Sequence, residues 1–511
     1  MSFLGIDIGT TGCKAVIFNK TGDILAEEYA EHSLIHPKPG WVELDPNLIF
    51  FNIKNIVKKA LQKLSNNKLN NDKVKALAIS CQGEAVIPVN KEGNTLYNAI
   101  VTFDNRTQEQ YEFWKKGLGG KIVFEITGMP LNPMYSINKI MWLKKYRKDI
   151  FKETAKFLCF EDFIQMKLGV TPKISYSLAA RTSAFDIVRK EWSKEILAEA
   201  NISIDLLSTP APSAEPIGEI NSAIAEEVGL PEGVVIATGG HDQACGAFGA
   251  GIINESVAMN AAGTSDVITV MLNKPYINET MLKNNYPCAP YVIPDKYTAL
   301  TFNLTGGLLL KWFRDNFCYE EIQLAQKEGK NVYKIIDEKM YDKPVDVFIL
   351  PHFAGSGTPT LDANSKGIII GLDIETNKSK LSRAVLESNA YDLKLNLEKI
   401  ESMGIKINNL IAIGGGAKSP AWLQIKANVL NKPIKILKNS EAASLGAALL
   451  AGISIGEYRN FVEAVEYAVK PENEFVPHLD MVNEYEKRYD IYKSIYSTNK
   501  YLLHKISKLD T

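Results

Sequence analysis

A short turn near the start of the chain groups the residue types that bind phosphate and a divalent cation. An apolar run carries Asp7 near its end, a Gly-Thr-Thr-Gly turn supplies Thr10 and Thr11, and Lys14 enters the next apolar run. This pattern predicts a β-hairpin with a polar tip. The tip offers backbone N–H groups and hydroxyls to phosphate, Lys14 offers a point charge, and Asp7 suits hydrated Mg²⁺. A plain glycine turn is the alternative interpretation.

Acidic and amide side chains follow two further predicted strands. Asp242 comes after a β-branched run and two glycines, where a carboxylate could accept a proton from a hydroxyl that attacks phosphorus. A helix N-cap is the alternative role for Asp242. Gln82 and Glu84 follow a strand predicted over 74–80 and could bind hydroxyl groups, although an ordinary polar loop has the same composition.

The pattern of the first hairpin recurs near residue 255. A predicted strand over 257–262 leads into Gly263-Thr264-Ser265, and a second strand is predicted over 266–271. A strand–turn–strand unit near the start of each half indicates an internal duplication, and chance similarity of a short segment is the competing explanation. Two such turns facing each other would hold one polyphosphate from both sides.

A glycine-rich loop over 414–417 separates a predicted strand from a helix that begins at Ser419-Pro420. Exposed backbone at such a loop can lie against a nucleotide, although similar loops are often purely structural. The chain contains neither the dinucleotide-binding fingerprint nor the G-x-x-x-x-G-K-[ST] sequence of a P-loop.

The elements that must position these residues follow from the rest of the pattern. A third strand is predicted over 24–29, and Asp45-Pro46 begins an amphipathic helix that extends through residue 64. Residues 108–205 are expected to be mostly helical, and residues after about 456 are expected to form a charged helical extension. A chain of 511 residues is expected to form two or three domains.

Composition excludes several classes of function. The formal net charge is −1, which gives no electrostatic reason to expect nucleic acid or membrane binding. Six scattered cysteines form no C-x-x-C pair, which suits a reducing compartment and argues against a zinc site. Without a signal peptide pattern or an apolar run of membrane-spanning length, we expect a cytoplasmic enzyme, with a homodimer left open.

The ordered segments together resemble the FGGY family of carbohydrate kinases over roughly residues 3–455. The resemblance implies an α/β fold of two ribonuclease-H-like, actin-like domains, with ATP and a sugar in the cleft between them. It implies an N-terminal domain over 1–252, a C-terminal domain over 253–455 and a helical extension over 456–511. The resemblance is carried by 5–16, Gly40-Trp41 with Asp45-Pro46, 104–106, 239–243, Gly263-Thr264 and 414–417.

Carried over by position, the resemblance assigns a role to each candidate residue. Asp242 corresponds to the general base, and Asp7 to the acid that is linked to Mg²⁺. The nucleotide is expected to contact Thr10, Thr11, Lys14, Gly263, Thr264, Gly415, Gly416 and Ala417. The sugar or polyol is expected to contact Gln82, Glu84, Asp104, Arg106 and Gln243.

Departures from the family pattern concern the acceptor rather than the kinase core. Gly83 stands where glycerol kinases carry Arg, Thr102 stands where they carry Trp, and xylulose and gluconate kinases carry Gln-Met-His where this chain has Gln82-Gly83-Glu84. The smaller residues predict room for a substrate longer than glycerol. The expected activity is ATP-dependent phosphorylation of a ketose such as xylulose, or of a related pentulose, hexulose or polyol. Gluconate or glycerol kinase is the alternative, and an actin- or Hsp70-like ATPase is the alternative of another class.

Overall fold

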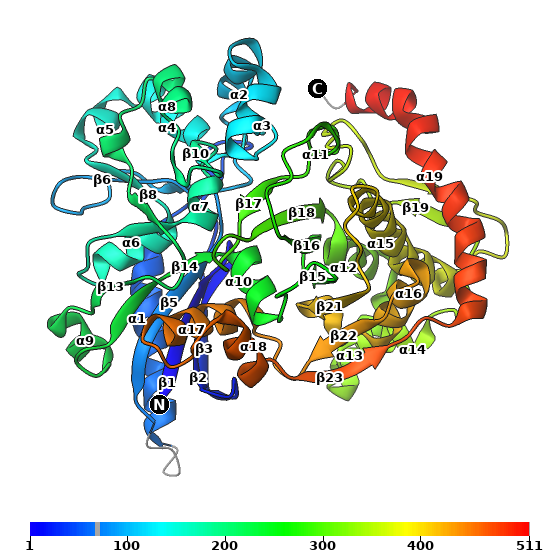
Figure 1. Cartoon of the computed structure of the whole chain (residues 1–511). Coiled ribbons are helices and arrows are strands. Elements are labelled where there is room, and N and C mark those ends of the chain that lie inside the picture. The colour runs from blue at the N-terminus through cyan, green and yellow to red at the C-terminus, as the bar shows by residue number, and fades with distance from the viewer. Residues whose placement is uncertain (67–71, 510–511) are drawn as a thin grey trace.

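Two large β-sheets organise the chain into two lobes (Figure 1). The computed structural model describes residues 1–66 and 72–509. Among these residues the first sheet has the order β13-β14-β5-β1-β2-β3 and the second β17-β18-β16-β15-β21-β22-β23. The first is built from β1 (Ser2–Ile8), β2 (Gly12–Asn19), β3 (Ile24–Glu31), β5 (Val74–Cys81), β13 (Pro216–Glu219) and β14 (Val235–His241). The second is built from β15 (Val257–Ala262), β16 (Asp266–Leu272), β17 (Cys288–Pro290), β18 (Tyr297–Asn303), β21 (Asn409–Ile413), β22 (Ile434–Leu437) and β23 (Pro471–Phe475).

The two sheets repeat one topology. In the first, β14, β5 and β1 run parallel, and β2 and β3 follow antiparallel. In the second, β22, β21 and β15 run parallel, and β16 and β18 follow antiparallel. An antiparallel strand, β13 or β23, closes the same edge of each sheet. The duplication that the two hairpins predicted is therefore confirmed at the level of whole sheets.

Helices cover the sheets and connect the strands. In the first half they are α1 (Pro46–Asn66), α2 (Gln108–Lys116), α3 (Gly119–Thr127), α4 (Ser136–Tyr146), α5 (Lys148–Glu153), α6 (Phe160–Lys167), α7 (Tyr176–Ala180), α8 (Lys194–Ala200), α9 (Ser222–Val228) and α10 (Asp242–Gly249). In the second half they are α11 (Glu279–Lys283), α12 (Gly306–Phe317), α13 (Tyr319–Glu328), α14 (Val332–Lys339), α15 (Lys378–Glu401), α16 (Pro420–Leu430), α17 (Ala442–Ser454), α18 (Phe461–Ala468) and α19 (Leu479–Ser507). The Asp45 carboxylate accepts the N–H of Asn47 and begins α1 as expected.

Short strands and 3-10 turns complete the fold; they add detail to one prediction and correct another. The region over 108–205 is mostly helical, as predicted, because α2 to α8 make up more than half of it. The prediction missed the short strands β8 (Lys156–Leu158), β9 (Lys173–Ser175), β10 (Phe185–Asp186) and β11 (Glu191–Trp192), and the 3-10 turn η1 (Ile204–Leu206), which interrupt the helices. The segment after 456 is not purely helical, because β23 pairs with β22. The remaining elements are β4 (Glu43–Leu44), β6 (Ile87–Val89), β7 (Ala99–Ile100), β12 (Thr209–Ala211), β19 (Phe348–Leu350), β20 (Ile368–Ile370) and η2 (Gly415–Lys418).

Two small-residue helices, α10 and α17, cross between the lobes (Figure 1). Each follows the outermost parallel strand of its own sheet, yet α17 packs on β1, β5 and β14 of the other sheet. Glycine makes this approach possible: a Cβ on Gly446 would lie 2.0 Å from the carbonyl oxygen of Cys245, and one on Gly5 would lie 1.9 Å from that of Ser444. The domain boundaries at 252 and 455 stay predictions, and in space α17 belongs with the first sheet.

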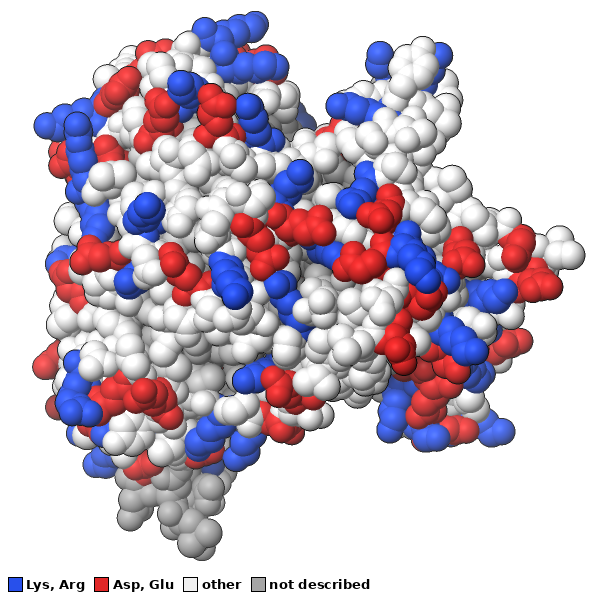
Figure 2. Space-filling view, turned by 45° about the vertical axis from the view of Figure 1, so that its right-hand side comes forward, with Lys and Arg blue, Asp and Glu red and all other residues white. Residues whose placement is uncertain are grey.

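The surface carries charges of both signs. On the face shown in Figure 2, Lys and Arg are interspersed with Asp and Glu and form no broad patch of one sign. Within the described part of the chain, no helix combines the length and the apolar composition needed to cross a membrane.

Gly446→Ala should lower the Tm by several degrees, because the added methyl group forces α10 and α17 apart and overpacking typically costs about 1–3 kcal/mol. Gly120→Ala is the matched control: Gly120 is also helical, and its Cβ would meet only the Leu131 side chain at 3.5 Å. Differential scanning calorimetry should show an unchanged or raised Tm for the control. Equal Tm values for both variants would contradict this account of the helix crossing.

Candidate active site

The first hairpin forms a polar turn that other side chains hold in place. The N–H of Gly9 donates to the carbonyl of Gly12 at 2.9 Å, and Thr11 is exposed at the tip. Gln82 donates from Nε2 to the carbonyl of Gly9 at 3.3 Å, and His32 Nε2 lies 3.1 Å from the same oxygen. Gln82, which was predicted to bind the acceptor, therefore also holds the turn of the first hairpin in place.

Asp7 and Lys14 face each other across the hairpin, since they are paired in the β1–β2 register. Ser80 donates to Oδ1 of Asp7 at 2.7 Å. Burial raises the pKa of Asp7 to about 6, with Ser80 and Lys14 opposing the rise and Glu441 adding to it. Lys14 Nζ lies 2.6 Å from Oε2 of Glu441, the residue before α17. Sequence reasoning missed Glu441, because only the helix crossing brings position 441 to the first hairpin.

Asp242 begins α10 at the end of β14, with its side chain 30% exposed. Burial, followed by the charges of Asp7 and Glu84, raises the pKa of Asp242 to about 7. His241 Nε2 lies 3.2 Å from Oδ1 of Asp242. Burial lowers the pKa of His241 to about 3, with Arg181 adding to the shift, so His241 is neutral at physiological pH. A carboxylate whose pKa lies near neutrality is suited to general base catalysis.

Glu84 is held by a buried cation that the sequence gave no reason to single out. The guanidinium of Arg181 donates to Oε1 of Glu84, with Nε at 2.5 Å, and both side chains are more than 90% buried. Thr102 donates to Oε2 at 2.8 Å, and Lys139 donates to the backbone carbonyl of Glu84 at 2.7 Å. Burial alone would raise the pKa of Glu84, but the charge of Arg181, together with other nearby positive groups and the hydrogen bond from Thr102, outweighs it and holds the pKa below its usual value. Cζ of the Arg181 guanidinium lies 5.4 Å from the ring centre of Tyr135.

Asp104 and Arg106 form a buried ion pair with several hydrogen bonds. Oδ1 of Asp104 accepts the backbone N–H and Nε of Arg106, and Oδ2 accepts a terminal guanidinium nitrogen of Arg106 and the N–H of Val42. The guanidinium also pairs with Glu43 at 2.8 Å and lies 4.0 Å from the ring centre of Trp41. All these hydrogen bonds are made within the protein, so the ion pair positions the loop around it. The predicted contacts of Asp104 and Arg106 with the acceptor stay predictions.

Gln243, one residue into α10, presents an acceptor that the protein leaves unused. Its Oε1 is buried and has no hydrogen-bond partner among the described residues. A buried amide oxygen without a partner costs about 1–3 kcal/mol, and a ligand hydroxyl would satisfy it. Gln243 directly follows Asp242, whose pKa the charge of Glu84 raises, so these three residues lie in one region.

The second hairpin and the glycine-rich loop adjoin each other in the second lobe. Gly263 and Thr264 are exposed, and their carbonyls accept the N–H groups of Gly307 and Leu308 at the start of α12. In the glycine-rich loop, a Cβ on Gly416 would lie 2.6 Å from the Cβ of Ala262, which ends β15. By contrast, a Cβ on Gly415 would meet nothing within 4 Å. The structure therefore brings Gly263, Thr264 and residues 415–417 together at one edge, with open backbone at Gly415.

Acidic groups near the first hairpin fit a hydrated cation better than a fully protein-ligated one. Among the described residues, no group of three or more His, Cys, Asp and Glu side chains could hold a metal ion. Mg²⁺ usually keeps several waters and takes one or two carboxylates together with substrate phosphates. Asp7, with Glu441 near it, is such a donor set.

Comparisons with known proteins match nearly the whole chain. Residues 2–249 match the N-terminal domain of the FGGY family of carbohydrate kinases, and residues 258–455 match its C-terminal domain. A xylulose kinase from Staphylococcus epidermidis is 30% identical over 98% of this chain and 97% of its own. An autoinducer-2 kinase from Yersinia pseudotuberculosis is 28% identical over 97% of this chain and 94% of its own. The crystal structure of a ligand-bound xylulose kinase from Lactobacillus acidophilus superposes with a TM-score of 0.89 over 99% of both chains, at 24% identity.

These matches confirm the two-domain, actin-like α/β fold that the sequence predicted. The chain belongs to the FGGY family of carbohydrate kinases.

Arg181→Leu should lower the free energy of unfolding at pH 7 by about 3–5 kcal/mol, because it leaves the Glu84 charge buried and unpaired. In the variant, burial raises the pKa of Glu84, so protonation relieves the cost and the deficit should narrow as the pH falls toward 5. Urea unfolding at both pH values measures this. Lys283→Leu, which breaks the exposed pair with Glu279, is the control and should change little. A deficit independent of pH would count against the pairing.

Proposed function

We propose that this kinase transfers the terminal phosphoryl group of ATP to a hydroxyl of a ketose such as xylulose, or of a related pentulose, hexulose or polyol. The observation that carries the proposal is the placement of Asp242. Its pKa is raised to about 7 by burial and by two carboxylates, Asp7 on the phosphate side and Glu84 on the acceptor side. Asp242 thus lies between the residues predicted to bind each substrate.

In the proposed reaction, Asp242 accepts the proton of the acceptor hydroxyl as that oxygen attacks the terminal phosphorus of ATP. A bond forms between the acceptor oxygen and phosphorus, and the bond from phosphorus to the bridging oxygen of ADP breaks. Thr10, Thr11 and Lys14 would contact the phosphates from the first lobe. Gly263 and Thr264 would contact them from the second lobe.

Further residues would hold the rest of ATP and its cation. The open backbone at Gly415, with Gly416 and Ala417, would lie along the nucleoside. Asp7 would hold Mg²⁺ through water, and the ion would offset phosphate charge in the transfer. Lys14 must exchange Glu441 for phosphate, or share its charge between the two, when ATP binds.

The acceptor side differs from the prediction in one respect. Gly83 leaves no open space, because a Cβ there would lie 3.0 Å from the His241 ring and 3.2 Å from the Arg181 side chain. Room for a longer acceptor therefore cannot come from Gly83. Support for a ketose comes instead from the unused acceptor of Gln243 and from the similarity to a xylulose kinase.

The alternative functions are of two kinds: a different class of ATPase, and a different acceptor within the same family. Membership of a carbohydrate kinase family leaves no support for an actin- or Hsp70-like ATPase that acts on protein partners. Gluconate and glycerol stay open as acceptors within the family. A homodimer and a cytoplasmic location stay predictions.

Asp242→Asn should lower kcat by about 10²–10⁴-fold, the usual effect of removing a general base. The wild-type kcat/KM for the acceptor should fall as the pH decreases from 8 to 6, because protonation of a group with a pKa of about 7 removes the base. His241, neutral throughout this range, should not contribute. A coupled ADP assay measures both. A variant that retains more than a tenth of the wild-type kcat would overturn the assignment.

Across an acceptor panel, kcat/KM for the best pentulose, hexulose or polyol should exceed that for glycerol at least tenfold. A short acceptor leaves buried groups such as Oε1 of Gln243 unpaired, which costs about 1–3 kcal/mol. Gln243→Leu should reduce this preference and leave the KM for ATP unchanged. Thr11→Val, in the turn of the first hairpin, is the converse control: it should raise the KM for ATP and leave the acceptor preference unchanged. Glycerol as the preferred acceptor would refute the proposal.

A further inference from the structure

A small cavity lies between the lobes, beside the buried pair of Glu84 and Arg181. Its volume is about 40 Å³, and its walls come from both halves of the chain. Tyr135 and Arg181 line it from the first half, and Asn285, Phe302 and Leu361 line it from the second. A space of this size can hold ordered water, and it is too small for a whole sugar. Removing a side chain that lines this cavity should therefore let an acceptor extend further past Arg181.

Strained backbone surrounds this cavity. Leu361 has φ +52°, Asn285 has φ +56°, and Glu84, held by Arg181, has φ +63°. A left-handed conformation is a clear outlier for a branched residue such as Leu and costs of order 1–3 kcal/mol. Such a conformation persists only where surrounding contacts fix it, and in many proteins these contacts serve a functional site.

The contacts that fix the backbone at Leu361 come from its own loop, where its N–H donates to the carbonyl of Gly357 at 2.7 Å, and from the far end of the chain. The next residue, Asp362, accepts hydrogen bonds at Oδ2 from the hydroxyl of Tyr496 at 2.7 Å and from Nε2 of His504 at 2.6 Å. Both residues lie on α19. The N–H of Asp362 donates to Oγ of Ser356 at 2.7 Å, which closes the loop.

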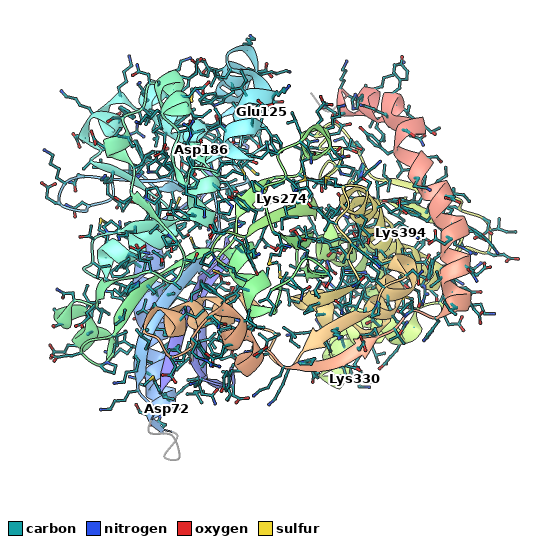
Figure 3. The ribbon with its side chains drawn as sticks, in the orientation of Figure 1. Asp72, Glu125, Asp186, Lys274, Lys330 and Lys394 are labelled. Atoms are coloured by element: carbon teal, nitrogen blue, oxygen red, sulfur yellow. The ribbon has the colours of Figure 1, made fainter. Side chains whose placement is uncertain are left out.

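The helix that supplies these contacts is itself firmly anchored on the second lobe. Tyr485 donates to Glu387 of α15 at 2.9 Å, and Arg383 of α15 donates to the Tyr485 hydroxyl at 2.6 Å. Lys394 of α15 pairs with Glu486, and Figure 3 shows Lys394 between α15 and α19. The helix α19 thus serves as a rigid support that runs from the second sheet to the loop at 352–365.

We propose that Leu361 is a specificity-determining residue that limits acceptor length from the second lobe, and that Asp362, held by Tyr496 and His504, positions it. This inference rests on the proposed sugar kinase function. It gives the C-terminal helix a role in acceptor choice, although the helix lies outside the segments matched to the family.

Leu361→Gly removes the wall and suits the left-handed backbone, so the variant should fold. The kcat/KM ratio of a ketohexose to a ketopentose should rise at least fivefold over wild type, and the KM for ATP should stay within twofold. Leu361→Asn is the control: it keeps a side chain of similar size and tolerates positive φ, so its ratio should stay within twofold of wild type.

The positioning role is tested by a matched pair of variants on α19. Tyr496→Phe should shift the same ratio in the same direction at least twofold. Tyr489→Phe removes a comparable hydrogen bond, from the Tyr489 hydroxyl to Glu398 at 2.8 Å, and should not shift the ratio. In Leu361→Gly, adding Tyr496→Phe should have no further effect on the ratio, which a general loss of stability would not reproduce.

The outcomes separate the inference from the proposed function. A wild-type enzyme that phosphorylates no acceptor in the panel would overturn both. An active wild type with an unchanged ratio in Leu361→Gly would overturn the inference alone. A shifted ratio in Leu361→Gly, with Tyr496→Phe and Tyr489→Phe behaving alike, would overturn the positioning role of Asp362.

Discussion

The close approach of α10 and α17 is the constraint on which the rest of the site depends. Their backbones meet where a Cβ on Gly249 would lie 1.9 Å from the carbonyl oxygen of Ala442, and Gly446 makes the reciprocal contact with Cys245. Each helix leaves one sheet and packs against the other, so neither lobe is complete without the other half of the chain. Asp242 begins α10, and Glu441 immediately precedes α17. The crossing therefore sets the positions of the acid at the centre of the site and of the carboxylate that holds Lys14.

The acidic residues of the site differ in pKa, and the differences suit them to different roles. Glu84 is paired with Arg181, and its pKa is held low, so its carboxylate stays charged and fixed. Asp242 has no comparable cation at hydrogen-bond distance among the described residues, and burial with like charges raises its pKa to about 7. Asp7 lies between these cases, with a pKa of about 6 and a hydroxyl donor in Ser80. One site therefore contains three different carboxylates: Glu84 stays charged, Asp242 can take up a proton, and Asp7 is suited to a hydrated cation. Their different environments follow from burial and pairing alone.

Local pattern was enough to predict the hairpins and the duplication, because alternating apolar residues and glycine turns depend on neighbours in the sequence. It could not predict Arg181 or Glu441, since their importance comes from partners 97 and 427 positions away. It also gave the wrong reason for acceptor size at Gly83, where the space of a missing side chain is filled by His241 and Arg181. The strand β23 was missed for a similar cause: Pro471–Phe475 is short, polar and largely exposed, and it is a strand only because β22 offers it an edge.

The two sheet edges show why the C-terminal segment is integral to the second lobe. In the first sheet, β13 precedes β14 in the chain and closes the edge before α10 begins. In the second, the strand that closes the same edge, β23, comes after α17 and α18 have crossed to the first lobe and returned. The chain must therefore extend past the last family-matched residue to complete the duplicated sheet. Once back at the second lobe it continues directly as α19, whose length carries it from the sheet edge to Asp362.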